Sequence, residues 1–286
     1  MRFMMLVKSN AQAEAGELPD EKLLSVMGAF NDELIKAGVM LAGEGLKQSA
    51  LGTRIRYSKG QFTVTDGPFA ETKELVAGFW LIRARSRAEA LDWAKRAPFR
   101  DGEVEVRPLY EAEDFGGPPA DAATESAPTI RPAPKTGERR MRFMGLLKAD
   151  HLTEAGAPPN EKLMTEMGAL MDEMSREGML LGGDGLKPTS QGARVRYQGR
   201  ERTIIDGPFT ESKEIVAGFS IQLHRSKEEA IAFSKRFIKI HVDGLNAGAG
   251  ECELRPLQEL EDFPVDASEK PDGWRDHERA FRERSS

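Results

Sequence analysis

The sequence contains little cysteine or histidine, the side chains that hold most transition-metal ions in proteins. Cysteine occurs once in 286 residues, as Cys252, so no disulfide can form within the chain, which fits a reducing compartment. The four histidines, His151, His224, His241 and His277, all fall in the second half of the chain. We therefore expect no metal centre of the His/Cys type and no other cofactor.

Long apolar runs and an excess of positive charge are also missing. No run approaches the roughly 20 apolar residues that span a bilayer. The opening MRFMMLVK is too short, and too charged at its ends, for a signal peptide, so a cytoplasmic location is expected. The chain carries 41 basic and 47 acidic residues, a net charge of −6. Since binding to a phosphate backbone needs a basic surface, we expect neither nucleic acid nor a membrane as partner.

What the chain does contain is a repeat. MRFMMLVK at Met1 returns as MRFMGLLK at Met141, and this offset of 140 residues then holds without a gap as far as Arg96 and Arg236. The second copy next has about eight extra residues, and the copies rejoin at EVEVRPL and ECELRPL. The duplication predicts two small units that pair within the chain as an internal pseudo-dimer; a homodimer is the alternative.

The boundaries of the repeats follow from composition. We expect a first repeat over residues 1–115, a linker over 116–140, a second repeat over 141–263 and a polar tail over 264–286. The linker is rich in Pro, Ala, Ser and Thr and has few large apolar residues, which predicts flexibility. The tail either packs in part as a helix through Trp274 and Phe281 or is disordered.

Each repeat shows the same order of elements. Alternation predicts a strand in RFMMLVK, and helical spacing of apolar residues predicts a helix between the cap Asp20 and the stop Gly38. A strand at Val39–Leu46, a hairpin around Lys59-Gly60, a strand at Leu75–Ala84, a helix opened by Ser86 and Glu89, and a strand in VEVRPL complete the unit. This order predicts an α+β fold made of two ferredoxin-like βαββαβ repeats, each with an inserted hairpin.

The strand at 75–84 has two faces that change differently between the copies. Phe79 and Leu81 share a face that stays apolar in the second copy, whereas the opposite face becomes Ser220 and Gln222. We expect the constant face to lie under the helices and the changed face to look at the partner repeat or a cavity.

Two residues that occur in the second copy alone are further candidates for a site, Cys252 and His224. Cys252 takes the place of Val104, and a half-buried strand residue is favoured over a nucleophile. His224 lies on the changed strand face, and a surface position at the strand end is favoured over a unique role in a site.

The most specific shared string is TDGPFAETKE (Thr65–Glu74), which returns as IDGPFTESKE (Ile205–Glu214). Asp-Gly-Pro is turn chemistry, because Asp accepts backbone N–H bonds, Gly allows positive φ and Pro fixes the next φ. Two carboxylates that flank an ammonium could instead orient a base or bind a polar ligand. A braced turn is favoured, and the candidate catalytic residues of the alternative are Asp66, Glu71, Lys73, Asp206, Glu211 and Lys213.

Pairs of arginines alternate on the strand that precedes each string. Arg54 and Arg56 share one face, as do Arg194 and Arg196, because the residue between them is apolar. These arginines are either solvated or face a polar cleft, where they would form an ionic network with the carboxylates of the string or bind an anionic ligand; the solvated surface is favoured.

The pattern resembles the YCII-related family, in particular the subgroup named for its DGPF string. The resemblance rests on DGPFAETKE with AGFWLIRA, EALDWAKR and EVEVRPL, and on DGPFTESKE, AGFSIQL, EEAIAFSKR and ECELRPL in the second copy. It implies ferredoxin-like units paired as a dimeric α/β barrel around a cleft, similar to small enzymes of the muconolactone isomerase kind. A His–Asp pair proposed for some relatives cannot be carried over, because no histidine is repeated. The frequent association of the subgroup with extracytoplasmic-function sigma factors suggests regulation.

Three functions follow as hypotheses. The first is a polar cleft between the repeats that binds, and in an enzyme transforms, a small polar or anionic molecule, with Asp or Glu as base and Lys and Arg as charge stabilisers. The alternative is a regulatory module that binds a protein such as a sigma factor through an apolar patch. The third is a plain scaffold in which the string only braces a turn.

Overall fold

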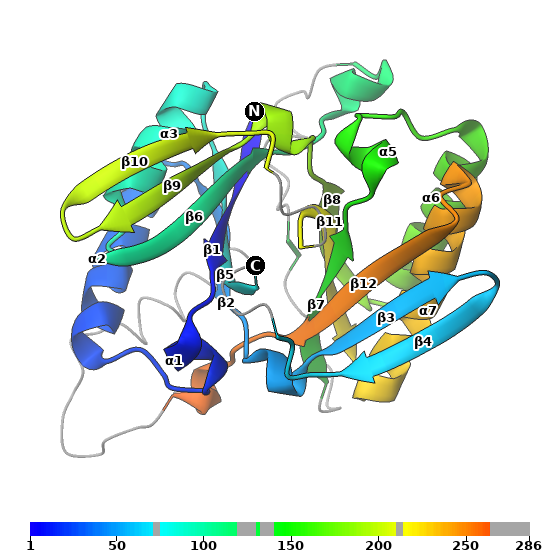
Figure 1. Ribbon diagram of the computed structural model, residues 1–286, viewed down its shortest axis with the longest axis horizontal. Helices are drawn as coiled ribbons and strands as arrows, with labels where there is room; N and C mark the ends of the chain where they lie inside the picture. The colour runs from blue at the N-terminus through cyan, green and yellow to red at the C-terminus, as the bar shows by residue number, and fades with distance from the viewer. Residues whose placement is uncertain (71–74, 119–129, 132–139, 210–213, 264–286) are drawn as a thin grey trace.

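In the computed structural model, residues 1–70, 75–118, 130–131, 140–209 and 214–263 are described. They form two antiparallel sheets of six strands each, which face each other and carry the longer helices on their outer sides (Figure 1). The class is therefore α+β, and the two halves pair within one chain, as the duplication predicts.

The two repeats contain the same elements in the same order. The first comprises β1 (Arg2–Lys8), α1 (Ala11–Glu14), α2 (Glu21–Lys36), β2 (Met40–Gly45), η1 (Ser49–Leu51), β3 (Thr53–Ser58), β4 (Gln61–Asp66), β5 (Val76–Arg83), α3 (Arg87–Arg96), β6 (Asp101–Pro108) and η3 (Ala112–Phe115). The second comprises β7 (Met141–Lys148), α5 (His151–Glu154), α6 (Glu161–Arg176), β8 (Leu180–Gly185), η4 (Thr189–Gln191), β9 (Ala193–Gln198), β10 (Glu201–Asp206), β11 (Val216–His224), α7 (Lys227–Leu245), β12 (Ala249–Pro256) and η5 (Leu260–Asp262).

Local signals set the helix ends. The Asp20 side chain accepts from the N–H of Leu23 at 2.7 Å and caps α2, which ends just before Gly38 at φ +69°. Ser86 accepts from the N–H of Glu89 at 3.2 Å at the start of α3, so the predicted helix start is confirmed. The hairpin turn is confirmed as well, with Lys59 and its neighbouring glycine both at positive φ.

The hairpins are exchanged between the repeats. The sheet order is β10-β9-β6-β1-β5-β2 in one sheet and β4-β3-β12-β7-β11-β8 in the other. Hairpin β3–β4 therefore extends the sheet of the second repeat, where Ile55 pairs with Cys252, and Val195 of β9 pairs with Val104 of β6. Each sheet is complete only with strands from both copies, so the repeats form one folding unit.

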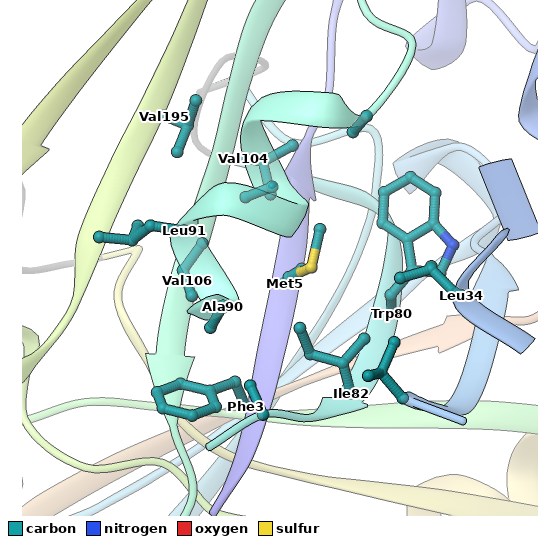
Figure 2. Close-up of a cluster of buried hydrophobic side chains, with 14 of the residues drawn as sticks. Phe3, Met5, Leu34, Trp80, Ile82, Ala90, Leu91, Val104, Val106 and Val195 are labelled. Atoms are coloured by element: carbon teal, nitrogen blue, oxygen red, sulfur yellow. The ribbon is translucent and has the colours of Figure 1, made fainter. Parts of the chain in front are cut away.

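The apolar residues fill layers on both sides of each sheet. Met4, Leu6 and Phe79 belong to a core between the two sheets, and Phe79 lies 6.3 Å from Phe219 of the other copy, measured between ring centroids. A second core lies between the first sheet and its helices, where Trp80, Ile82, Phe3 and Met5 pack under α2 and α3 (Figure 2).

The expected directions of the β5 faces were therefore wrong. Phe79 and Leu81 look at the partner sheet, and Trp80 and Ile82 lie under the helices. In the first repeat both faces are apolar, so strand alternation identifies which residues share a face but not which face the helices cover.

The changed face of β11 is buried under the helices of the second repeat. His224 is 1% exposed and Gln222 is also 1% exposed, so the expected surface position of His224 was wrong. A hydrogen bond of 3.1 Å joins the two side chains, and the Gln222 amide donates to Ser220 at 2.8 Å. Cys252 lies on β12 as expected and is buried, and its burial raises the pKa of the thiol to about 12.

Two linker residues are described. Arg131 donates its N–H to the carbonyl of Leu181 at 2.7 Å, and Ile130 packs against the core between the sheets. The tail with Trp274 and Phe281 lies outside the described residues. Across the described ranges, we find no helix with the length and apolar character that a bilayer span requires.

Candidate functional site

The two aspartates of the repeated string lie at the surface, at the end of each exchanged hairpin. Asp66 accepts from Lys227 of the second repeat and from the Thr53 hydroxyl, both at 2.7 Å, and these bonds lower the pKa of its carboxyl. Asp206 forms the equivalent ion pair with Arg87 of the first repeat. Both carboxylates therefore join the hairpin of one repeat to the second helix of the other.

The glycine and phenylalanine of the string make close contacts with the body of the protein. A Cβ on Gly67 would lie 1.9 Å from the carbonyl oxygen of Ser49, so the backbone approach there requires glycine. The N–H of Phe69 donates to the Ser49 hydroxyl at 3.2 Å, and the Arg54 guanidinium lies over the Phe69 ring at 4.1 Å. Gly207 and Phe209 repeat this arrangement at Thr189 and Arg194.

Arg54 belongs to a group of largely buried charges around carboxylates of the second repeat. We call this group the second ion cluster (Arg54, Lys148, Glu214, Glu253 and Arg255). Arg54 Nη2 lies 2.7 Å from Glu214 and 3.0 Å from Glu253. Lys148 contacts the same two carboxylates at 2.9 and 3.1 Å, and Arg255 contacts Glu253 at 3.0 Å. Although burial alone would raise the pKa of Glu253, these three cations lower it to about 2, so the carboxyl stays ionised.

The first ion cluster (Lys8, Glu105, Arg107 and Arg194) repeats this arrangement in the other half. Glu105 lies 3.2 Å from Lys8, 3.0 Å from Arg107 and 3.2 Å from Arg194. Burial would raise the pKa of Glu105, but the three cations lower it to about 2. Both clusters flank the apolar core between the sheets, so the charged side chains there bind one another across the repeat boundary.

The other residues predicted from the sequence are partly exposed or lie outside the described residues. Arg56 and Arg196 are about half exposed and face Glu251 and Glu103, at 3.7 and 2.6 Å. The candidate catalytic residues Glu71, Lys73, Glu211 and Lys213 lie outside the described residues. The structure thus brings Arg54 and Arg194 to buried carboxylates and leaves Asp66 and Asp206 in exposed ion pairs. A shallow depression beside Asp206 is lined by Arg87, Ser190 and Gln191.

A larger hollow lies elsewhere, on the outer side of the first sheet. We call it the outer cavity; it has a volume of about 560 Å³ between α2, the edge strand β2 and the start of β6. Its apolar lining includes Leu23, Leu24 and Met27 of α2 together with Trp80 and Phe99. Asn31 also lines it and accepts the indole N–H of Trp80 at 2.8 Å.

The outer cavity exists because the second helix differs in length between the repeats. Helix α3 has 10 residues, whereas α7 has 19 and continues along the start of β12. A Cβ on Gly244 of α7 would lie 2.8 Å from Leu163, the counterpart of Leu23. A Cβ on Gly250 of β12 would lie 2.6 Å from Val242, whereas its counterpart Gly102 has nothing within 4 Å.

The extra turns of α7 therefore fill, in the second repeat, the space that stays open in the first. The sequence contained this signal, since the second copy has about eight more residues after Arg236 than the first has after Arg96. Sequence reasoning missed the cavity because an insertion suggests a longer element and does not show which space that element fills.

Comparison with known proteins gives two results. The model of the YCII-related domain matches residues 1–113 and 141–238, that is, both repeats separately. An uncharacterized protein of Rhizobium meliloti (strain 1021) is 39% identical over 93 residues, which are 32% of this chain and 75% of that protein. With both repeats matched, and the described strands and helices in the order that the resemblance implies, the chain belongs to the YCII-related family as a tandem duplication.

Proposed function

We propose that this protein binds a small, mainly apolar molecule in the outer cavity of its first repeat. The observation that carries the proposal is the cavity itself, about 560 Å³ in volume and lined by Leu23, Met27, Trp80 and Phe99. Ligand sites in proteins are typically hollows of roughly 300–1,000 Å³ with apolar walls and a few polar groups. Asn31, with its amide beside the indole of Trp80, is such a polar group.

This location differs from the polar cleft between the repeats that the sequence suggests. Between the sheets, Arg54 and Arg194 are engaged by buried carboxylates, so their guanidinium groups bind the protein itself. A base such as Asp66 would also lie at the surface, where its carboxylate is 68% exposed and paired with Lys227. Binding is therefore better supported than catalysis, and no reaction is assigned.

The test uses a neutral fluorescent dye, Nile red, and the full chain. We expect saturable binding of one dye per chain, with increased emission as the dye leaves water. Replacing residues 97–101 with residues 237–249 would give the first repeat the longer second helix and fill the cavity. Binding should then weaken at least about tenfold, a loss of about 1.4 kcal/mol, while the melting temperature stays the same or rises.

A point substitution provides a matched control. Leu23→Trp places a large ring into the cavity from α2 and should weaken dye binding, whereas Met164→Trp adds the same ring on α6, where Met164 is 50% exposed. Equal binding by the wild type, the graft and Leu23→Trp would refute the proposal. Dye binding that appears only after deletion of residues 264–286 would also count against it, since the tail would then be the occupant.

A second candidate function is the protein-binding module suggested by the resemblance. Strand β4 lies at the edge of its sheet, and Phe62 and Val64 on one of its faces are 37% and 41% exposed. Such an edge can accept a strand from a partner. We expect a complex with an extracytoplasmic-function sigma factor of the same organism to be lost with Val64→Lys and kept with Ile204→Lys, its counterpart on β10. Gel filtration of the purified mixture tests this, and elution as two separate proteins would refute it.

A further inference from the structure

We propose that the molecule held in the outer cavity is a hydrophobic amine, with a positively charged nitrogen on an apolar body. The inference rests on the proposed function and adds the charge of the ligand. The ligand charge inferred here is positive, whereas the paired arginines of the sequence suggested an anionic ligand. Those arginines lie away from the outer cavity.

The lining of the outer cavity carries more negative than positive charge. Among the lining residues described, two carry an ammonium group, Lys8 and Lys47, and each already contacts a carboxylate: Lys8 contacts Glu105 at 3.2 Å, and Lys47 contacts Asp262 at 2.5 Å. The lining carboxylates are more numerous: Glu17, Asp32, Glu44, Asp101, Glu103 and Asp262. Three of them are in ion pairs, Glu44 with Arg142, Glu103 with Arg196 and Asp262 with Lys47. Glu17 and Asp101 are exposed, and the net negative charge of the lining residues favours a cation over an anion at the mouth of the cavity.

The carboxylates of the lining come from separate elements of the fold. Glu17 precedes α2, Asp32 lies on α2, and Asp101 begins β6, so negative charge reaches the cavity from separate elements of the fold. Leu23, Leu24 and Met27, which form the apolar wall, lie between Glu17 and Asp32 in the sequence. An elongated molecule with one charged end would match this arrangement of polar and apolar surface.

Two aromatic rings form part of the lining. Trp80 and Phe99 lie 6.0 Å apart, measured between ring centroids, and both border the cavity. Aromatic ring faces attract ammonium groups, by about 0.5–1 kcal/mol at exposed sites and by about 2 kcal/mol when water is excluded. Aromatic rings together with carboxylates are suited to a cation that also carries apolar substituents.

The second repeat fills the equivalent space with α7. There the counterparts of the key lining residues have lost this chemistry: Trp80 becomes Ser220, Phe99 becomes Ala247, Asp101 becomes Ala249 and Glu17 becomes Ala157. The aromatic rings and two of the carboxylates thus occur in the copy that has the cavity. A general excess of acidic residues at the surface would not explain why these residues and the cavity occur in the same repeat.

The test compares three probes of the same shape that differ in charge: 2-naphthylmethylamine, 2-naphthalenemethanol and 2-naphthoate. Titration calorimetry on the full chain at low salt should give the tightest binding for the amine and the weakest for the carboxylate, at least about tenfold apart. Raising the salt should narrow the difference, because screening acts on the charged probes and not on the alcohol.

Variants locate the effect. The double variant Asp32→Asn with Asp101→Asn should bring amine affinity close to that of the alcohol, while alcohol affinity stays the same. Asp172→Asn, at the counterpart of Asp32 on α6, is the matched control and should change neither. If the alcohol binds but the amine binds no tighter, or if the double variant keeps the preference, the charge inference is wrong and the proposed function stands. If none of the three probes binds, the proposed function is wrong as well.

Discussion

Arg54, on a strand of the first repeat, lies 3.0 Å from Glu253 of the second, whose carboxylate is fully buried. Its counterpart joins Arg194 of the second repeat to Glu105 of the first at 3.2 Å. Each exchanged hairpin thus carries an arginine into the other repeat. The buried carboxylate that receives the arginine also receives a lysine and a second arginine, so its removal would leave three buried cations short of a partner.

The first prediction concerns this carboxylate. Glu253→Gln should lower the free energy of unfolding by about 3–5 kcal/mol, because breaking a buried ion pair leaves uncompensated charge in the interior. Glu251→Gln, two residues earlier on the same strand, removes the pair with the half-exposed Arg56 and a longer contact of 3.9 Å with Arg54, and should cost less than about 1 kcal/mol. Urea denaturation measures both. Similar losses for the two variants would show that the cluster contributes no more than a surface pair.

The exchanged hairpins lead to the second prediction. Residues 1–118 alone lack β9 and β10, which extend their sheet, and residues 140–286 alone lack β3 and β4. We expect the two pieces, when expressed together, to form a stable one-to-one complex. Each piece alone should either aggregate or exchange hairpins with a second copy of itself. Light scattering after gel filtration distinguishes these states, and a stable monomer formed by either piece would contradict the prediction.

The local elements of each repeat could be predicted from the sequence, whereas the exchange of the hairpins could not. Capping residues such as Asp20 and Ser86 act within a few positions, so the helices could be predicted from the sequence. The hairpin itself was also predictable from Lys59-Gly60. The strand that the hairpin pairs with could not be predicted. Ile55 pairs with Cys252 of the second repeat, although Val104, the equivalent residue of its own repeat, would fit the same alternation of apolar residues. Duplicated sequences give equivalent strands equivalent surfaces, so pattern alone cannot choose between them.

In the candidate site, too, the sequence points to some features and misses others. Sequence singled out Arg54 and Asp66 because charged residues recur in both copies, and the recurrence reflects ion pairs that join the repeats. The outer cavity depends instead on a difference between the copies, the shorter second helix beside Trp80. A search for repeated residues favours shared structural contacts and passes over features of a single copy.

The third prediction concerns pH. His224 is buried beside Gln222, and this burial lowers the pKa of its imidazole to about 4, despite the opposing charge of Glu229. An unfolded histidine titrates near pH 6.5, so between about pH 6.5 and 4 the unfolded chain binds a proton that the folded chain does not. Stability should therefore fall as the pH is lowered through this window, by up to about 1.4 kcal/mol per pH unit, and the contribution should level off below it.

The measurement compares unfolding free energies of the wild type and of His224→Leu from pH 7.5 to 4. Other groups, including the buried His241, titrate in both proteins, so the difference between the two slopes isolates His224. The wild type should show the steeper decline. Parallel curves would mean that His224 takes up its proton in the folded state as readily as in the unfolded one.

The last prediction concerns the glycine of the repeated DGPF string. A Cβ at Gly67 would lie 1.9 Å from the carbonyl oxygen of Ser49, a backbone atom that can move only with its whole segment. Gly67→Ala should therefore displace the string, break the hydrogen bond from Phe69 to Ser49, and cost more than about 2 kcal/mol, the scale of a strained or overpacked interior.

Gly60→Ala is the matched control for this substitution. Gly60 sits in the hairpin turn at φ +76°, and a Cβ there would meet nothing within 4 Å, so its replacement should cost about 1 kcal/mol of backbone strain. Thermal unfolding of both variants measures the difference. A larger loss at Gly67 would mean that close packing against Ser49 requires the glycine in the string, and the same constraint at Gly207 and Thr189 would account for its presence in both copies. Equal losses would show that the segment around Ser49 yields easily, which would leave the repeated string to be explained by chemistry.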